Sequence, residues 1–458
     1  MLVPMFLSIY YEEAQWPAFL SAAFLALLCG GLMVFFSRSN EEIRHGEGFV
    51  IVALGWLLAS IFGSLPYLFT GTVNSFSDAF FETVSGFTTT GASVLTNIEA
   101  VTKGMLFWRS LTHWLGGMGI IVLFVAVLSL FGNEAMQMFK AEVPGPVPEK
   151  IKPRIRETAK ILWLTYLSLT GAQFLLLLIA GMDPFDAINH TFATLATGGF
   201  STKNASVGAF DSPLIHWVII IFMYLAGVNF TLYYQALRGK NLKFFWRNEE
   251  FVLYSAIIAI AIVAISINFF KAGLEYDFTA IVFQVVSIIT TTGFATVDFE
   301  IWPVFPQVVL LTLIFVGGCS SSTAGSVKVG RYLILFKQVS SELRHLIHPR
   351  AVSSLKVNQK SLSADYIFNV YQYFFLYMTI VVLSTLVLTF SGTDLVTSFS
   401  AVATTLGNVG PGLGSIGPAD NYAHFSGGIK IFFSFLMLLG RLEIYTLLIL
   451  LFPSTWRK

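Results

Sequence analysis

Long apolar segments separated by short polar ones recur along the whole chain. Nine of them are long and apolar enough to cross a bilayer as helices. They lie at about 17–36, 48–70, 106–131, 160–181, 213–237, 250–270, 305–339, 366–390 and 428–452. The seventh segment is interrupted by small polar residues. This pattern predicts a multi-pass helical membrane protein.

Four further apolar segments are too short to cross a bilayer. They lie at about 76–87, 184–195, 277–290 and 393–405. Each ends in sequence rich in glycine and threonine, and each stands between two of the long segments. Non-helical backbone at membrane depth must be buried in protein or line a water-filled cavity. We therefore expect four short re-entrant helices, each followed by a buried loop.

The four loops share a motif and a common period. They read FTTTGAS from residue 87, TLATGGFS from 194, ITTTGFA from 289 and TTLGNVG from 404. Their leading glycines, Gly91, Gly198, Gly293 and Gly407, are 107, 95 and 114 residues apart. One such loop could serve helix packing alone, because small residues are common where helices approach in lipid. Four at one period favour a pore built by internal repetition.

The repeat predicts the fold class and the domain boundaries. We expect an all-α membrane protein with four membrane–pore–membrane repeats around a single central ion pore, and an extra N-terminal transmembrane segment. The predicted units are 1–47 for the N-terminal region, then 48–138, 139–240, 241–345 and 346–458 for the four repeats.

Composition agrees with the membrane assignment and excludes other classes. Of the 458 residues, 55% are hydrophobic and only 12% charged, with a net charge of +1. Soluble domains carry about 25% charged residues, and nucleic-acid-binding proteins are normally basic. The two cysteines, Cys29 and Cys319, lie far apart and form neither a disulfide framework nor a metal-binding spacing. The opening residues lack the basic flank and cleavage site of a signal peptide.

The distribution of basic residues predicts the orientation. If 139–160 lies inside, then 38–47, 238–250, 328–360 and the C-terminus do so as well. These five segments hold 21 of the 27 lysines and arginines. We therefore expect a cytoplasmic C-terminus and an outer N-terminus.

The outer segments are rich in acids. Among them are Asp78, Asp183, Asp186, Asp277, Asp298 and Asp394. A vestibule rich in carboxylates would concentrate cations. The alternative is that acids are merely tolerated on the outer face.

Glycine and threonine suit a cation filter. A dehydrated cation needs oxygen ligands, which rings of backbone carbonyls provide in potassium channels. Glycine permits the backbone geometry that such a ring requires, and each short helix would direct the negative end of its dipole at the ion. Because Ala196 and Leu406 stand where the other loops have threonine, the pore should be only approximately fourfold.

Several longer motifs resemble the Trk/Ktr/HKT superfamily of cation transporters, and within it the membrane subunits of bacterial Trk potassium-uptake systems. The resemblance covers essentially the whole chain. It rests on HWLGGMGIIVL (113–123), AEVPGPV (141–147), TGGFS (197–201), NFTLYY (229–234), GGCSSSTAGSVKV (317–329), HPRAV (348–352), GNVGPGLG (407–414) and GRLEIYTLLILL (440–451).

The resemblance implies a potassium filter, a location and partners. The implied potassium ligands come from Thr88, Thr89, Thr90, Gly91, Ala196, Thr197, Gly198, Thr290, Thr291, Thr292, Gly293, Thr404, Thr405, Leu406, Gly407 and Asn408. In plant relatives a serine in place of the first filter glycine accompanies sodium preference, so glycine at all four positions favours potassium. The family also implies a homodimer in the bacterial inner membrane and a cytosolic ring of nucleotide-binding regulatory subunits, which 139–160 and 338–360 would contact. No organic cofactor is implied for this chain.

The interrupted segment at 305–339 predicts a gate. Its small and hydroxyl residues at 317–326 cannot sustain a lipid-facing helix, and they suit a loop buried below the filter. The expected gating residues are Gly317, Gly318, Ser320, Ser321, Ser322, Thr323, Gly325 and Arg441. Arg441 is included because an arginine within a span is a functional candidate, and the loop supplies its natural partners.

Alternatives remain for the loop and for the function. The loop could be a polar kink, whereas a nucleotide-binding loop fails on the spacing to Lys328. Arg441 could be purely structural. Sodium- or proton-coupled potassium symport, or sodium transport, could use the same scaffold, although coupled transporters usually have inverted repeats and charged midplane sites. A membrane enzyme would need a convergent catalytic set, which the sequence lacks.

Overall fold

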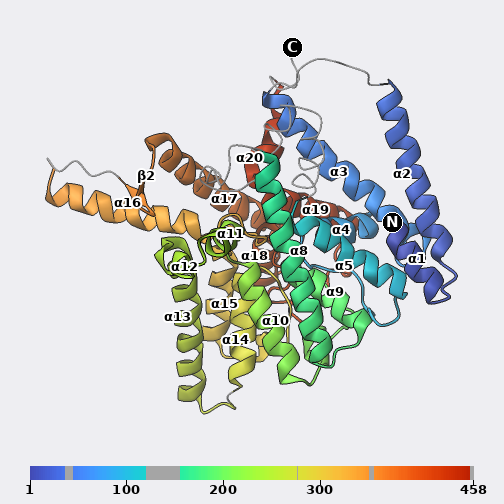
Figure 1. The fold of residues 1–458 in the computed structure, drawn as a ribbon, viewed down its shortest axis with the longest axis horizontal. Coiled ribbons are helices and arrows are strands. Elements are labelled where there is room, and N and C mark those ends of the chain that lie inside the picture. Colours follow the sequence, from blue (N-terminus) through green and yellow to red (C-terminus); the bar gives the residue numbers. More distant parts are fainter. Residues whose placement is uncertain (37–44, 120–154, 276, 350–354, 454–458) are drawn as a thin grey trace.

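The computed structural model describes residues 1–36, 45–119, 155–275, 277–349 and 355–453. Within these residues the chain is a bundle of helices with one two-stranded hairpin (Figure 1). Five described helices are long and apolar enough to cross a membrane, and a bent pair passes the same test together. The prediction of an all-α membrane protein is confirmed.

Four units of like architecture follow one another. Each consists of a long helix, a short helix, a loop and a second long helix or helix pair. The helices are α3 (His45–Phe69), α4 (Phe76–Phe87) and α5 (Lys103–Gly117) in repeat 1; α8 (Ile155–Ile179), α9 (Pro184–Leu195), α10 (Pro213–Ala226) and α11 (Phe230–Gly239) in repeat 2; α13 (Glu249–Ala272), α14 (Phe278–Ile289), α15 (Val304–Val316) and α16 (Val329–Ile347) in repeat 3; and α17 (Ala364–Phe390), α18 (Leu395–Gly407), α19 (Gly427–Arg441) and α20 (Glu443–Leu448) in repeat 4.

The remaining elements join or precede the repeats. They are α1 (Leu2–Tyr10), α2 (Trp16–Phe36), α12 (Lys243–Arg247), the short helices η1 (Ser206–Ala209), η2 (Phe299–Ile301) and η3 (Ile449–Leu451), and the strands β1 (Lys356–Val357) and β2 (Lys360–Ser361). The predicted span 17–36 is thus α2, which stands before the first repeat.

The four short helices begin at polar caps. The side chains of Ser75, Asp183, Asp277 and Asp394 each accept a hydrogen bond from a backbone N–H in the first turn of α4, α9, α14 and α18. Such caps satisfy N–H groups that a helix start leaves without partners. The predicted segments 76–87 and 184–195 coincide with α4 and α9, and the other two agree within two residues. Re-entrant helices are therefore present in all four repeats.

Two large clusters make up most of the apolar core, beside a small third one formed by Leu106, Phe107 and Phe185. One cluster joins the N-terminal helices to repeats 1 and 4, and includes Phe81, Trp108 and Phe433. The other joins repeats 2 and 3, and includes Phe283 and Ile314. The short helices of repeats 1 and 4 contribute to the first of these clusters, and those of repeats 2 and 3 contribute to the second. The four loops that follow the short helices therefore lie where the two large clusters meet.

Two predicted spans differ from the structure. The segment 213–237 is not one helix, because α10 and α11 are bent by 91° at residues 227–229. The bend is stabilised by the Asn229 side chain, which accepts from Thr231 N, and by the loop of repeat 3, whose Ser321 carbonyl accepts from Phe230 N. The predicted span 106–131 begins in α5, but residues beyond 119 lie outside the described part of the chain. The motif at 141–147 and most of the predicted inner segment 139–160 also lie outside it.

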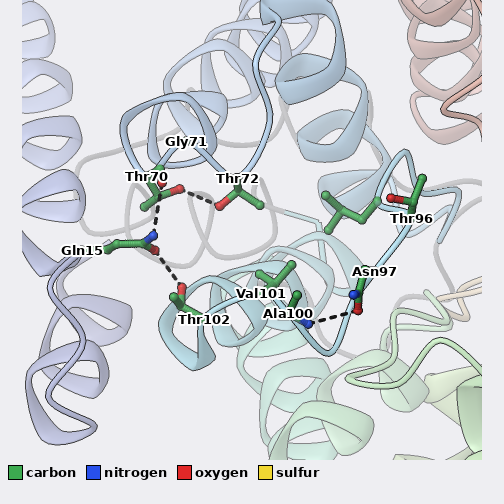
Figure 2. Close-up of a pocket in the computed structure, with 10 residues that line it drawn as sticks. Gln15, Thr70, Gly71, Thr72, Thr96, Asn97, Ala100, Val101 and Thr102 are labelled. Atoms are coloured by element: carbon green, nitrogen blue, oxygen red, sulfur yellow. Dashed lines mark hydrogen bonds between the residues drawn. The ribbon is translucent and has the colours of Figure 1, made fainter.

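A carboxylate attaches the N-terminal hairpin to repeat 1. Glu13, in the turn between α1 and α2, accepts hydrogen bonds from Lys103 N at 2.6 Å and Gly104 N at 3.0 Å at the start of α5. Beside it, Gln15 bridges the Thr70 carbonyl and the Thr102 hydroxyl at one side of a polar pocket (Figure 2). A negative charge at a helix N-terminus is stabilising. Glu13 therefore serves as the cap that α5 does not supply from its own sequence.

Replacement of Glu13 by glutamine should loosen this attachment. Loss of the charge at two N–H groups is expected to lower the free energy of unfolding by about 1 kcal/mol. The thermal midpoint of the detergent-solubilised protein should fall by a few degrees, and Glu12→Gln, on the exposed neighbour, should leave it unchanged. An equal midpoint for both variants would contradict the assignment of Glu13 as the cap.

Candidate pore and intramembrane loop

Each short helix ends at a residue in the left-handed conformation. These residues are Thr89, Thr197, Thr291 and Asn408, with φ between 53° and 58°. In every repeat the N–H of the next residue then bonds to a carbonyl five positions back, as in Thr90 N to Ser85 O at 2.9 Å. Such a turn ends a helix abruptly. The same backbone geometry therefore starts all four loops.

Two residues after the left-handed position, each loop has a glycine with positive φ. These are Gly91, Gly199, Gly293 and Gly410, with φ of 81°, 77°, 77° and 96°. The residue between the left-handed position and the glycine is Thr90, Gly198, Thr292 or Val409. The loops thus share a three-residue pattern of conformation despite their different side chains.

The four loops contact one another in cyclic order. A Cβ atom on Gly91 would lie closer than 3 Å to the carbonyl oxygen of Gly198 in repeat 2. The same close approach joins Gly199 to Thr292 O and Gly293 to Val409 O. Gly410 then approaches Thr90 O, which closes the circuit at repeat 1. We call these four glycines and the four residues that precede them the ring.

The ring corrects the predicted equivalence of the glycines. Gly91 and Gly293 stand in it at corresponding places, but Gly198 precedes the ring glycine Gly199 by one residue. Gly407, three residues before Gly410, is the last residue of α18. The residues Thr404, Thr405 and Leu406 are also helical and do not belong to the loop. Spacing alone could not reveal that α18 continues further than the other short helices relative to its motif.

The threonine hydroxyls mostly bond to their own segment. Thr88 donates to the Val84 carbonyl at 2.7 Å and lies 2.8 Å from the Thr90 hydroxyl. Thr290 and Thr292 repeat this pair. Because these side chains are used behind the loop, the backbone carbonyls are the oxygen atoms most suited to face an ion. In repeat 4, Asn408 donates instead to Thr90 Oγ1 at 3.0 Å, across to repeat 1.

A cavity on the side of the ring that the sequence predicts to be outer is lined by all four ring glycines. Most of the predicted vestibule acids have local structural roles instead. Asp183, Asp277 and Asp394 are helix caps, Asp298 caps η2, and Asp78 pairs with Lys430 at 2.6 Å. These contacts favour the alternative that the outer acids serve the fold.

Glu300 lies in η2 beside the outer cavity and holds the loop of repeat 4. Its carboxylate accepts from the backbone N–H of Gly414. Burial raises the pKa of Glu300, although that hydrogen bond opposes the change. Glu300 is therefore a contact between repeats 3 and 4.

The loop at 317–326 lies directly against the inner ends of the short helices. Gly325 N donates to Thr291 Oγ1 at 2.7 Å, and the Thr323 hydroxyl donates to the Leu195 carbonyl at 3.0 Å. A Cβ on Gly325 would also approach the Gly407 carbonyl. The loop thus contacts repeats 2, 3 and 4 at the same level.

Arg441 connects this loop to the first repeat. It donates to the Thr323 carbonyl at 2.9 Å and to Thr89 Oγ1 at 3.2 Å. It also bonds to the carbonyls of Gly116 and Gly117 at the end of α5. The contact with the loop carbonyl is the one that the sequence suggests.

The loop has a strained backbone, and the surrounding residues, which include a buried acid, keep it in this conformation. Ser321, Ser326 and Lys328 have φ of 58°, 62° and 74°, values that are unfavourable for residues other than glycine. At the other side, Ser320 N donates to the buried carboxylate of Glu250 at 2.6 Å. Such strain persists only where the surroundings impose it. Of the predicted gate residues, Gly317 and Gly318 form the turn out of α15, and Ser322 lies beside Thr323.

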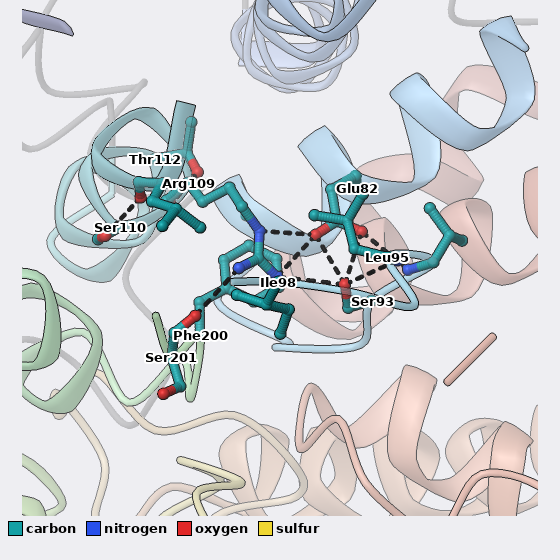
Figure 3. Close-up of polar contacts among 12 residues, drawn as sticks. Glu82, Ser93, Leu95, Ile98, Arg109, Ser110, Thr112, Phe200 and Ser201 are labelled. Carbon is teal, nitrogen blue, oxygen red and sulfur yellow. Dashed lines mark hydrogen bonds and ion pairs between the residues drawn. The ribbon is translucent and has the colours of Figure 1, made fainter. Parts of the chain in front are cut away.

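Sequence analysis missed several buried polar residues. Arg109 is not singled out there, yet it is 1% exposed and paired with Glu82 (Figure 3). Glu250 and the bend at 227–229 were not singled out. An acid in the middle of a short, mainly apolar segment, as at Glu82, is the signal that could have identified the pair, because charges are rarely buried without a partner.

Comparison with known proteins places the chain in a family. The family model described as a cation transport protein, TrkH, matches residues 15–457. The chain belongs to the TrkH family of cation transport proteins. It is 42% identical to the Trk system potassium uptake protein TrkH of Escherichia coli K12, over 100% of this chain and 96% of that protein. It is 37% identical to the TrkG protein of the same organism, over 100% and 95%.

A solved structure of the family agrees with the fold. The crystal structure of the potassium transporter TrkH from Vibrio parahaemolyticus matches with a TM-score of 0.89 and 40% identity, over 100% of this chain and 96% of that chain. The TrkH-family membership confirms the resemblance that the motifs indicate, and the match supports the fourfold repeat.

The glycines of repeat 4 distinguish the ring from the predicted filter. Gly410→Ala should abolish cation uptake. The φ of 96° at this residue is strained for alanine, and a Cβ atom would overlap the Thr90 carbonyl oxygen. Gly407→Ala should retain uptake, because this helical residue has no neighbour closer than 3.4 Å to an added Cβ. Tracer rubidium uptake into liposomes, with equal amounts of folded protein, measures both. Loss in Gly407→Ala with activity in Gly410→Ala would reverse the assignment.

Proposed function

We propose that this protein takes up potassium through a gated, channel-like pore formed by the ring. The observation that carries the proposal is the cyclic contact of four loops, each from one repeat, within a single chain. Its curated relatives are named potassium uptake proteins. A closed circuit of backbone around one axis is the arrangement that carbonyl coordination of a cation requires.

Backbone oxygens and helix dipoles would supply the ligands and the field. The candidate ligands are the carbonyls of Thr90, Gly198, Thr292 and Val409, with those of the left-handed residues before them. The short helices end beside these residues, so that four partial negative charges are directed at the same place. No ionised side chain is needed in the ring itself, which suits rapid release of a monovalent ion.

The loop at 317–326 would act as the gate. It fills the inner side of the ring through Gly325 and Thr323, and Arg441 holds it there. Opening would require the loop to give up these hydrogen bonds, which a change in the surrounding helices could drive. α16, which follows the loop directly and extends from the bundle in Figure 1, is the segment best placed to transmit such a change.

The wider arrangement follows the family. We place the protein in the bacterial inner membrane with a cytoplasmic C-terminus, as a homodimer, in contact with a cytosolic ring of nucleotide-binding regulatory subunits. The inner segments 139–160 and 338–360 would provide the contact. The repeat boundaries 48–138, 139–240, 241–345 and 346–458 are retained as the units of the pore, and the boundary at 138 lies outside the described residues.

Purified protein in potassium-loaded liposomes should take up tracer rubidium, driven by the outward potassium gradient. Potassium should compete more strongly than sodium, because every loop keeps the glycine that the family resemblance associates with potassium preference. Gly91→Ser, the matched variant, should narrow the difference between the two competitors. Uptake that requires sodium or protons would support coupled symport instead, and absence of uptake even with the regulatory subunit and nucleotides would refute the proposal.

Removal of the Arg441 side chain should increase uptake. Without its hydrogen bonds to Thr323 and Thr89, the closed position of the loop is less stable, and the initial rate should rise roughly fivefold or more. Arg441→Lys, which keeps the charge, should rise less, and Arg247→Ala, at an exposed arginine of α12, should not change the rate. A folded Arg441→Ala protein with unchanged or lower uptake would assign the arginine a structural role.

A further inference from the structure

A buried ion pair contacts the loops of repeats 1 and 2, just after their ring glycines. Glu82 of α4 and Arg109 of α5 are 0% and 1% exposed, and their side chains approach to 2.8 Å (Figure 3). Burial of both charges requires that each be fully paired, since an unpaired charge in such surroundings is very unfavourable. The contacts of the pair therefore report what it holds in place.

The pair forms hydrogen bonds with the segments that follow the ring glycines in repeats 1 and 2. Arg109 donates to Ser93 Oγ at 3.1 Å in repeat 1 and to the Ser201 carbonyl at 3.2 Å in repeat 2. Glu82 accepts from Ser93 Oγ at 2.9 Å and from Val94 N at 2.9 Å. The central guanidinium carbon of Arg109 also lies 4.0 Å from the centroid of the aromatic side chain of Phe200. One planar group with donors in several directions thus bridges both strands, which a lysine could not do.

The two bridged serines occupy equivalent places. Ser93 follows Gly91 by two residues, and Ser201 follows Gly199 by two residues. In the other repeats, Ala295 and Gly412 stand at this place. There the backbone N–H groups bond only to neutral oxygens, of Ser206 and Ile416. Among the described residues, an ion pair at this place, which we call the charged brace, is therefore found only at repeats 1 and 2, whereas the loop of repeat 4 is held further along by the Glu300 carboxylate at Gly414.

Electrostatics explains why the brace is a pair. Arg109 lines the outer cavity beside the ring glycines. A lone cation there would repel an approaching potassium ion. Glu82 removes the net charge but keeps the strong, directional hydrogen bonds of both groups. A pair can thus fix the backbone of two strands without opposing the passage of cations.

We propose that Glu82 and Arg109 are positioning residues that set the preference for potassium over sodium. They would do so by fixing the spacing between the strands of repeats 1 and 2, two residues beyond the ring glycines. The proposal rests on potassium uptake through the ring and adds to it the determinant of selectivity. In this proposal the two side chains act through the position of the backbone and not as ligands, so their loss should change the relative affinity for the two ions.

The test compares ion competition in matched variants. Rubidium uptake into liposomes is measured with potassium or sodium as competitor for the wild type, Glu82→Gln, Arg109→Gln and Ser93→Ala. We expect the potassium-to-sodium preference to fall roughly tenfold in either glutamine variant and about threefold in Ser93→Ala, which keeps both charges and loses one contact of the brace. Lys337→Gln, which breaks the ion pair with Glu249 at the other side of the molecule, should keep the wild-type ratio.

Each outcome has a defined meaning. Folded glutamine variants with the wild-type ratio overturn the proposal. Glutamine variants that fail to fold, together with a wild-type ratio in Ser93→Ala, assign the pair to folding alone and also overturn it. If the wild type itself shows no uptake inhibited by potassium, the proposed function fails, and this result is distinct from any change among the variants.

Discussion

The structure depends on how closely four backbone strands approach one another at membrane depth. At each approach a glycine faces the carbonyl of the next strand with no space for a Cβ atom. Because lipid offers no hydrogen bonds, backbone that leaves a helix here must be enclosed by protein. The repeats provide this enclosure for each other, since every strand is bounded by two neighbours. No single repeat could hold its own loop in this conformation.

The backbone of the intramembrane loop must also find its hydrogen-bond partners within the protein. Its N–H and C=O groups bond to Thr291, Gly227 and Arg441, which belong to three different repeats. The loop is thus held by partners from several repeats, and its Ser321 carbonyl in turn stabilises the bend between α10 and α11 by accepting from Phe230 N. In the proposed mechanism, opening of the loop would therefore change hydrogen bonds that it shares with repeats 2, 3 and 4.

Sequence reasoning identified the elements but not the whole register. Segment length and the Gly/Thr motif were enough to find all four short helices, since a dozen apolar residues cannot cross a bilayer. The glycines of repeats 2 and 4 were misaligned because TGG contains two candidates and because α18 runs on to Gly407 before Asn408 turns the chain. Asn408 and Gly410 carry the true signal, which only φ values and the cyclic contacts reveal. Glu82 escaped notice because its partner Arg109 is 27 residues away on another helix.

The four repeats are not identical, and each contributes contacts that the others lack. Repeats 1 and 2 have the charged brace behind their strands, repeat 3 supplies the loop, and repeat 4 supplies Arg441. A homotetrameric pore must place any such group four times around the axis, which would bring four loops or four arginines into one narrow space. Within a single chain each can occur once. One arginine then suffices to contact one loop, and four carbonyl and hydroxyl oxygens accept hydrogen bonds from it.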